Sequence, residues 1–310
     1  SEVAGCSMAG ARTVTTTSGP GTLRAMENFA MWSGTRAPMQ LCLMARGINS
    51  PLSIQPDNLE VQYLLETGCM IWYAENVQEL FDMSLAAFTV AEQPDVHVPI
   101  ITAVDGFFVS HTREAVELPD DDIALEPYNP YAAPLPPIDS EMPPGRFLRD
   151  PFVMKSNYIS YATHASWQWE IRSAVERSKP YARKLLNGLI HVSGNEDAEI
   201  AFIACGTASN QAKEGQRELE KLGIKSKVLK LRTIRPFPEE ELIKELDGIK
   251  HVFVPEFNVV GWLANEVKAK LYGKVDVNIH AGPKVAGGMS LPAEAIIQEV
   301  MEVVNPGKGA

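Results

Sequence analysis

The hydrophobic positions of this chain alternate between short, nearly continuous apolar runs and longer stretches with a helical period. Continuous runs occur over residues 37–45, 69–74 and 97–104, as expected for strands that are buried on both faces of a parallel sheet. Between the last two, residues 77–93 place their apolar side chains on one helical face. Strands and helices that alternate in this way predict an α/β fold with a doubly wound parallel sheet.

The chain opens with a further unit of the same kind. A run rich in Thr and Val, residues 10–18, leads into a Ser-Gly-Pro-Gly turn at residues 18–21, and a helical pattern continues over residues 22–33. The backbone N–H groups of such a turn lie at a helix N-terminus, where the helix dipole favours an anion. An ordinary turn between strand and helix is the simpler explanation of this stretch alone.

The same alternation returns in the second half of the chain. Strands are predicted over residues 198–204, 226–231, 251–255 and 275–281, and helices over residues 211–222, 239–246, 261–272 and 292–304. The pattern predicts a second α/β domain, again with a parallel sheet.

Two segments lack a period. Residues 48–62 carry Asn, Ser, Asp and two Pro, and predict a loop at the carboxyl end of a strand, where open α/β sheets bind ligands. Residues 118–151 hold nine of the 22 prolines and predict an extended connection, because proline removes a backbone donor and fixes φ. A helical pattern resumes over residues 167–186, interrupted at Pro180. We therefore expect a first domain over residues 1–117, a connection with a linker helix over residues 118–190 and a second domain over residues 191–310.

Composition excludes several classes of protein. The 310 residues include 28 basic and 39 acidic side chains, and the net charge of −11 argues against binding to the phosphate backbone of nucleic acids. The four cysteines show no Cys-x-x-Cys spacing, so the sequence has no signature of an iron–sulfur cluster or a structural zinc site. Free thiols and the lack of an apolar run of about 18 residues favour a cytoplasmic protein without a membrane span.

No complete catalytic motif is present in the sequence. It contains no Gly-x-Ser-x-Gly nucleophile turn, no Walker A sequence and no Gly-x-Gly-x-x-Gly after a strand. We therefore expect a subunit that supplies half of a site.

Arg46 is the most informative single candidate. It ends the buried run 37–45 beside the predicted loop, and a guanidinium at that place suits bidentate binding of a substrate carboxylate. The nearby acidic residues fit no metal-ligand spacing and predict a solvated loop or helix face. These acidic residues are Asp57, Glu60 and Glu66.

Two other polar groupings have a structural explanation that we favour over a functional one. Cys205-Gly206-Thr207, before a predicted helix, is either an anion site or only a turn. Asp105 and His111 are either an acid/base pair or a strand-end Asp and a loop His without a common role.

Several segments, taken together and in order, resemble the α subunit of 2-oxoacid:ferredoxin oxidoreductases of the pyruvate type. They are GARTVTTTS at residues 10–18, the pair Met26-Glu27, the strand that ends in Arg46, YAENVQE at residues 73–79 and DGFFVSH at residues 105–111. In the second domain, LRTIRPFP at residues 231–238 is similar to the family's signature before the second helix of its transketolase C-terminal-like domain. The resemblance covers almost the whole chain.

The resemblance implies a pyrimidine-type thiamine diphosphate domain followed by a transketolase C-terminal-like domain. The cofactor is then expected between this chain and a β-type subunit that binds the diphosphate and Mg²⁺. Iron–sulfur clusters are expected in a further, ferredoxin-like subunit, with ferredoxin as the electron acceptor. The implied reaction is the oxidative decarboxylation of a 2-oxoacid, with pyruvate as first candidate and coenzyme A as acyl acceptor. A non-catalytic scaffold subunit and a cluster-free, transketolase-like enzyme remain as alternatives.

Carried over by position, the resemblance assigns Arg46 to the substrate carboxylate and no metal ligand to this chain. The residues assigned to the cofactor are Thr17, Ser18, Gly19, Glu75 and Asn76. The first three match the family's Thr-Ser-x-x-Gly turn. For the last two, a helix cap and a subunit contact compete with a role in the site.

The sequence also departs from the family's pattern. Asn58-Leu59-Glu60 stands where a His-Ser-Asp triplet is usual, and Leu65 and Cys69 stand where Arg and Trp are common, so the identity of the 2-oxoacid stays open. The family's Tyr-Pro-Ile-Thr-Pro segment and its catalytic Glu fall before Ser1. We therefore expect that the chain starts inside a domain.

Overall fold

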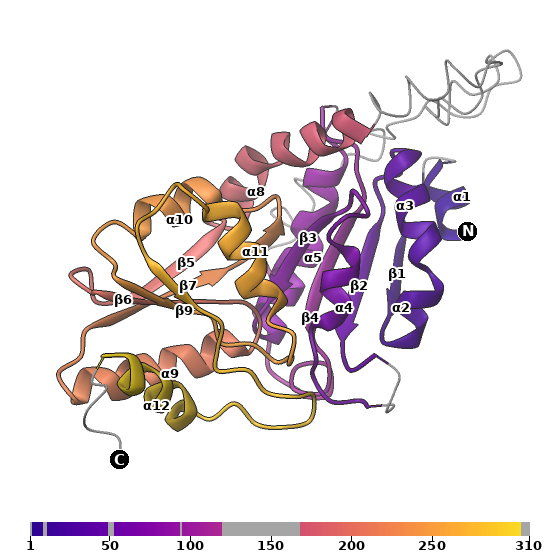
Figure 1. Ribbon diagram of the computed structural model, residues 1–310. Helices are drawn as coiled ribbons and strands as arrows, with labels where there is room; N and C mark the ends of the chain where they lie inside the picture. Colours follow the sequence, from indigo (N-terminus) through magenta and orange to yellow (C-terminus); the bar gives the residue numbers. More distant parts are fainter. Residues whose placement is uncertain (1, 9–10, 49–52, 94, 120–167, 305–310) are drawn as a thin grey trace, which may run out of the picture.

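The computed structural model describes residues 2–8, 11–48, 53–93, 95–119 and 168–304, which form two α/β halves that lie side by side (Figure 1). The first half contains α1 (Glu2–Met8), β1 (Val14–Thr17), α2 (Pro20–Arg24), α3 (Met26–Gly34), β2 (Gln40–Ala45), α4 (Leu59–Leu64), β3 (Met70–Ala74), α5 (Val77–Ala91) and β4 (Ile100–Asp105). The predicted proline-rich connection falls almost wholly outside the described residues.

Along the chain, two helices precede the strands of the second half: one over residues 168–177 and α8 (Lys179–Leu185). These two helices divide at Ser178, and Pro180 lies in the first turn of α8, where its missing N–H costs nothing. The remaining elements are β5 (Ile190–Gly194), β6 (Ile200–Ala204), α9 (Ala208–Lys221), β7 (Ser226–Leu231), β8 (Thr233–Arg235), α10 (Glu239–Glu245), β9 (His251–Phe253), α11 (Trp262–Leu271), β10 (Asn278–His280) and α12 (Ala293–Val304).

Each half is built on a mainly parallel five-stranded sheet, which confirms the predicted fold class. The sheet of the first half includes one strand, β8, from the second half of the chain. The first sheet has the order β1-β2-β4-β3-β8 and the second has the order β10-β9-β6-β7-β5. The pattern did not predict β5 and β8, which are antiparallel edge strands. β5 buries only Ile190 fully, and β8 has three residues, so neither shows the continuous apolar run of a central strand.

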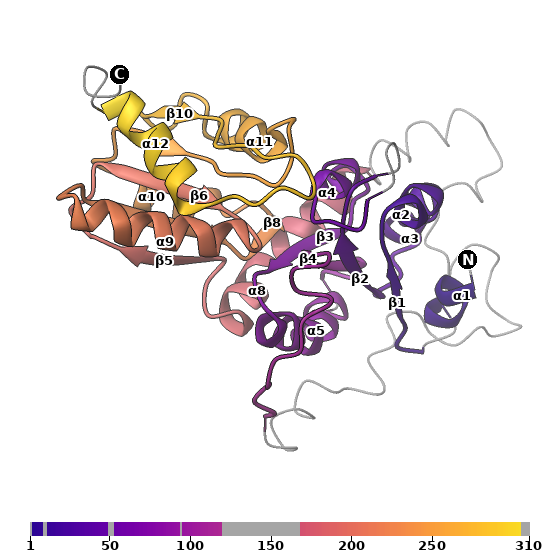
Figure 2. The same cartoon turned by 90° about the horizontal axis from the view of Figure 1, so that it is seen from below.

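A shared hydrophobic core joins the two halves. Ile71 of β3, Leu64 of α4, Trp262 of α11 and Ile203 of β6 belong to one buried cluster. The outer face of the first sheet is covered by α5 and the helices of residues 168–185, and the outer face of the second by α9 and α12 (Figure 2). Residues at or after the carboxyl ends of β2 and β4 also contact the second half, since the Asn58 N–H donates to the Phe257 carbonyl oxygen and Asp105 accepts the Thr207 N–H.

The prediction of a loop over residues 48–62 is wrong at its end, because α4 begins at Leu59. A helix of six residues is too short to show a helical period in the sequence. Its apolar residues Val61 and Leu64 are buried in the core between the two halves. Among the described helices, none is long and apolar enough to cross a bilayer.

Candidate functional site

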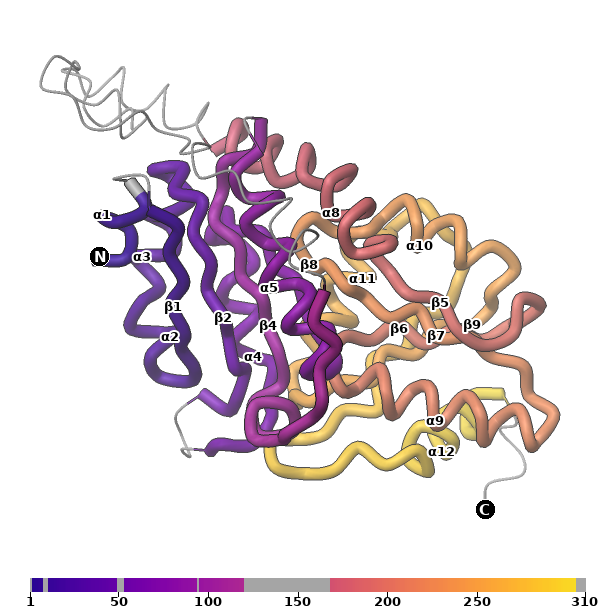
Figure 3. Tube along the Cα trace, turned by 180° about the vertical axis from the view of Figure 1, so that it is seen from behind, coloured from indigo at the N-terminus to yellow at the C-terminus, as the bar shows by residue number. Residues whose placement is uncertain are grey.

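The candidate site lies at the carboxyl edge of the first sheet, where the parallel strands end together. Ser18 follows β1, Arg46 follows β2 and Asp105 ends β4, and Figure 3 shows these three strands side by side. Glu75 follows β3, which pairs with the other side of β4. The topology therefore brings the predicted site residues to one edge of the sheet.

The turn after β1 is closed by a hydrogen bond from the Gly21 N–H to the Ser18 carbonyl oxygen, at 3.1 Å. Its first central residue, Gly19, has φ 56° and ψ −127°, a conformation that favours glycine. A Cβ on Gly19 would lie 2.9 Å from Cζ of Arg46. The guanidinium of Arg46 therefore packs directly against the backbone of the turn.

The guanidinium of Arg46 is held through two of its nitrogen atoms. Its Nε donates to Oγ of Ser18 at 3.0 Å, and its Nη1 donates to the carbonyl oxygen of Ser53 at 2.9 Å. Within the part of the chain that the structure describes, Nη2 has no hydrogen-bond or ion-pair partner. The half-buried side chain is thus oriented by the protein and keeps N–H donors for an anion.

Glu60 corrects a prediction from the sequence, since it is neither solvated nor on an exposed helix face. Its side chain is 0% exposed, in the first turn of α4. Oε1 accepts the backbone N–H groups of Gly19 and of Arg46, the latter at 3.0 Å, and Oε2 accepts the hydroxyl of Thr22 at 2.6 Å. Burial raises the pKa of Glu60, and these three donors and the charge of Arg46 oppose that shift. Nothing local in the sequence reveals Glu60, because its partners are 14 to 41 residues away.

Asn58 connects this cluster to the second half. Its Oδ1 accepts from Nδ2 of Asn258 at 2.8 Å and from Nε1 of Trp262 at 2.9 Å. Asn258 also donates to the carboxylate of Glu256, which accepts the first backbone N–H groups of α11. The start of α4, and with it Glu60, is therefore fixed by buried polar contacts to the second half.

The carboxylate of Asp105 binds at the turn of residues 205–207, for which the sequence predicts either an anion site or only a turn. Its Oδ2 accepts the backbone N–H of Thr207 at 2.6 Å and the Thr207 hydroxyl at 2.7 Å, while Oδ1 accepts the hydroxyl of Tyr73 at 2.6 Å. A Cβ on Gly206 would lie 2.4 Å from Oδ2, so glycine is required there. Burial raises the pKa of Asp105, and these donors partly oppose it. The turn binds an anion that belongs to this chain.

His111 does not pair with Asp105. Its ring is exposed, and Nδ1 lies 2.9 Å from Oγ of Ser110. The geometry therefore supports a strand-end Asp and a loop His without a common role, and not an acid/base pair.

Glu75 contacts the second half, and Asn76, next to it, caps a helix of the first half. Oδ1 of Asn76 accepts the backbone N–H of Glu79 at 2.8 Å and so caps α5. The Glu75 carboxylate lies 2.7 Å from Nζ of Lys213 and 3.0 Å from Nζ of Lys230. Burial alone would raise the pKa of Glu75, but Lys230 and Lys213 outweigh it and hold the pKa below 4.5. A cofactor contact of these two residues stays a prediction.

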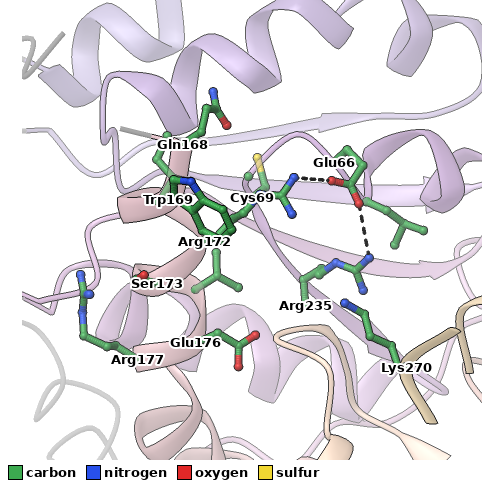
Figure 4. Close-up of a pocket in the computed structure, with 14 residues that line it drawn as sticks. Glu66, Cys69, Gln168, Trp169, Arg172, Ser173, Glu176, Arg177, Arg235 and Lys270 are labelled. Atoms are coloured by element: carbon green, nitrogen blue, oxygen red, sulfur yellow. Dashed lines mark hydrogen bonds and ion pairs between the residues drawn. The ribbon is translucent and has the colours of Figure 1, made fainter. Parts of the chain in front are cut away.

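A cavity of about 400 Å³ lies at the opposite end of the first sheet, next to Cys69, which precedes β3 (Figure 4). Its charged side chains are largely paired. Arg172 binds Glu66 at 2.9 Å, and Arg235 binds Glu266, also at 2.9 Å. Open α/β sheets bind ligands at the carboxyl ends of their strands, so the edge with Arg46 is the better candidate site. Among the described residues, no three or more His, Cys, Asp or Glu side chains form a group that could hold a metal ion.

Two protein families match the sequence. One is described as "Pyruvate flavodoxin/ferredoxin oxidoreductase, thiamine diP-bdg" and matches residues 1–177, and the other is described as "Pyruvate:ferredoxin oxidoreductase core domain II" and matches residues 198–296. The described strands and helices of the two halves fall within these matches or next to them.

Individual relatives agree with the families. The pyruvate synthase subunit PorA of Methanothermobacter thermautotrophicus is 31% identical over 310 residues, which cover 97% of this chain and 79% of that protein. The α subunit of an NADH-dependent phenylglyoxylate dehydrogenase of Aromatoleum evansii is 30% identical over 276 residues, which cover 82% of this chain and 63% of that protein.

Among solved structures, a 2-oxoglutarate:ferredoxin oxidoreductase from Magnetococcus marinus, with 2-oxoglutarate, coenzyme A and succinyl-CoA bound, matches with a TM-score of 0.70 and 20% identity. The match covers 97% of this chain and 55% of that chain, so this chain spans about half of that protein. At this identity the likeness establishes a common fold.

Proposed function

The chain belongs to the pyruvate flavodoxin/ferredoxin oxidoreductase family as an α-type subunit, and on this premise we propose that it contributes the substrate-binding arginine to a thiamine diphosphate-dependent 2-oxoacid oxidoreductase. The proposed reaction is the oxidative decarboxylation of a 2-oxoacid, with coenzyme A and a low-potential electron acceptor such as ferredoxin. Pyruvate is the first candidate substrate. The relatives named above act on pyruvate, phenylglyoxylate and 2-oxoglutarate, which share the 2-oxo acid group.

The observation that carries the proposal is the geometry of Arg46. Ser18 accepts from Nε and Ser53 accepts from Nη1, whereas Nη2 has no partner within the described residues. A charge-assisted pair with a substrate carboxylate would use the donors of Nη2, and the half-buried position of the side chain would strengthen that pair. The protein orients this donor group before substrate arrives, which lowers the cost of binding.

The turn at residues 17–19 supports contact with a cofactor shared between subunits and does not support a phosphate cradle. The N–H of Gly19 is already donated to Glu60, so it cannot also serve a diphosphate. The half-buried side chain of Ser18 lies against Arg46, and that of Thr17, also half-buried, precedes it at the end of β1. Thr17, Ser18 and Gly19 would line the cofactor, which supplies the means to cleave the bond between the 2-oxo carbon and the carboxylate.

Because this chain would contact only part of the cofactor, we propose partner subunits for the remaining groups. A β-type subunit would bind the diphosphate and Mg²⁺, and a ferredoxin-like subunit would carry the iron–sulfur clusters. Glu75 and Asn76 would act in this chain as a contact between the halves and a helix cap, since their side chains are engaged in those contacts. The four cysteines are free, which supports a reducing compartment such as the cytoplasm.

Kinetics of the purified native complex test the role of Arg46. We expect Arg46→Ala to lower kcat/KM for the 2-oxoacid about 30- to 1000-fold, mainly through a higher KM. This corresponds to a rise of about 2–4 kcal/mol in the activation free energy. Arg46→Lys keeps the charge but loses the fork, so we expect an intermediate effect. The assay follows 2-oxoacid-dependent reduction of a viologen acceptor.

The control is Arg217→Ala, which removes an exposed arginine of α9. It should leave KM unchanged. If Arg46→Ala also leaves KM unchanged, Arg46 is not a substrate ligand. If the native complex holds neither thiamine diphosphate nor iron and shows no activity, the scaffold alternative replaces the proposal.

A further inference from the structure

Glu60 joins three segments that are far apart in the sequence. It lies in α4, accepts a backbone N–H from the turn at Gly19 and a second from Arg46 after β2, and takes a hydroxyl from Thr22 of α2. A carboxylate is well suited to this place, because it accepts several hydrogen bonds and donates none. An apolar side chain there would leave the buried N–H of Gly19 and the part-buried N–H of Arg46 without partners.

The position of the turn and that of the guanidinium depend on each other. The guanidinium of Arg46 fills the space that a side chain on Gly19 would need, and Nε of Arg46 donates to Ser18 in the same turn. Glu60 binds the backbone of both partners with one oxygen, Oε1. Loss of that oxygen would free the turn and the arginine together.

We propose that Glu60 is a positioning residue, which holds the turn at Gly19 and the backbone of Arg46 in one arrangement so that the guanidinium faces the substrate carboxylate. The inference rests on the substrate role proposed for Arg46. Glu60 itself is fully buried below the turn, so it acts through Arg46 and does not touch the substrate.

The second half extends this arrangement. Asn58, two residues before Glu60, is fixed by hydrogen bonds from Asn258 and Trp262 of the second half. The second half therefore sets the place of α4, and α4 sets the place of Arg46 through Glu60. Asn58 and Glu60 are the ends of the triplet at which this sequence departs from the family's pattern.

The test compares Glu60→Ala with Glu60→Gln in the native complex. The Gln side chain keeps one oxygen for the two N–H groups, and its NH2 can donate to the Thr22 hydroxyl, so the contacts survive without the charge. Ala removes them all. Thr22→Val, which removes only the hydroxyl, is a milder variant that keeps the test informative if Glu60→Ala does not fold.

The first readout is amide hydrogen exchange, measured by mass spectrometry on peptides that contain Gly19 and Arg46. Exchange at these two amides should be at least about tenfold faster in Glu60→Ala and within about threefold of wild type in Glu60→Gln. Thr22→Val should lie between them. Unchanged protection of both amides in Glu60→Ala overturns the proposal, whatever the role of Arg46.

The second readout is the KM for the 2-oxoacid. We expect a rise of about tenfold in Glu60→Ala, little change in Glu60→Gln, and no further rise when Glu60→Ala is added to Arg46→Ala, because both variants lose the same contact. Independent, additive effects would overturn the proposal. If Arg46→Ala has no effect on KM while Glu60→Ala still frees the two amides, the proposed function fails but the holding role of Glu60 stands.

Discussion

The carboxyl edge of the first sheet is divided into two regions that differ in what their polar groups bind. After β1 and β2, Arg46 is oriented by its neighbours and keeps donors for a ligand. After β3 and β4, Glu75 and Asp105 are bound by groups of the second half. The first region is organised to receive an anion from outside, whereas in the second the chain supplies both the anion and its donors. One sheet edge thus serves binding on one side and assembly of the two halves on the other.

Asp105 should give the largest effect on stability. In Asp105→Ala, the fully buried hydroxyl of Tyr73 and both donors of the half-buried Thr207 lose their acceptor. We expect a loss of about 2–4 kcal/mol in the free energy of unfolding, measured by denaturant titration. Asp105→Asn should cost less, because its oxygen can serve Thr207 while its NH2 donates to Tyr73.

The matched control is Asp82→Ala, at an exposed position of α5. It should change the free energy of unfolding by less than about 0.5 kcal/mol. An equally small loss in Asp105→Ala would mean that the second region does not hold the halves together.

Glu75 should give a smaller effect that depends on pH. Its pKa is lowered in the folded protein, so its ion pairs contribute their full stability above the ordinary value of 4.5 and lose it as the pH falls through the folded-state pKa. Glu75→Gln should therefore cost about 1 kcal/mol at neutral pH, with the difference from wild type shrinking below about pH 4.5.

The measurement is the free energy of unfolding of both proteins between neutral pH and about pH 3. Comparison of variant with wild type cancels the buried carboxylates whose pKa is raised, such as Asp105 and Glu256, whose burial favours the protonated form. A difference that stays constant over this range would contradict the assignment of Glu75 to the ion pairs.

Much of this architecture could be predicted from the sequence, because central strands and long helices leave strong local patterns. The runs that became β2, β3 and β4 are nearly all apolar, and α5 shows a clear helical period. β5 and β8 left no such pattern, because each depends on pairing with a strand far away along the chain.

The site divides in the same way. The sequence singles out Arg46 as a candidate, because a single arginine directly after a buried strand is unusual, and its role in the site stays a prediction. The buried position of Glu60 could not be predicted, because it depends on contacts with Gly19, Thr22 and Arg46. In addition, the second half sets the place of α4. The contact between Asp105 and Thr207 could not be predicted either, because the sequence shows the turn at residues 205–207 but not that the carboxylate of Asp105 binds there.

The difference between the two regions is tested most directly by the KM for the 2-oxoacid in Arg46→Ala and Glu75→Gln, measured in the native complex under the same conditions. We predict a rise of at least about tenfold in Arg46→Ala and a change below about twofold in Glu75→Gln. An equal rise in both variants, or a rise in Glu75→Gln alone, would contradict the division of this edge into a binding region and an assembly region.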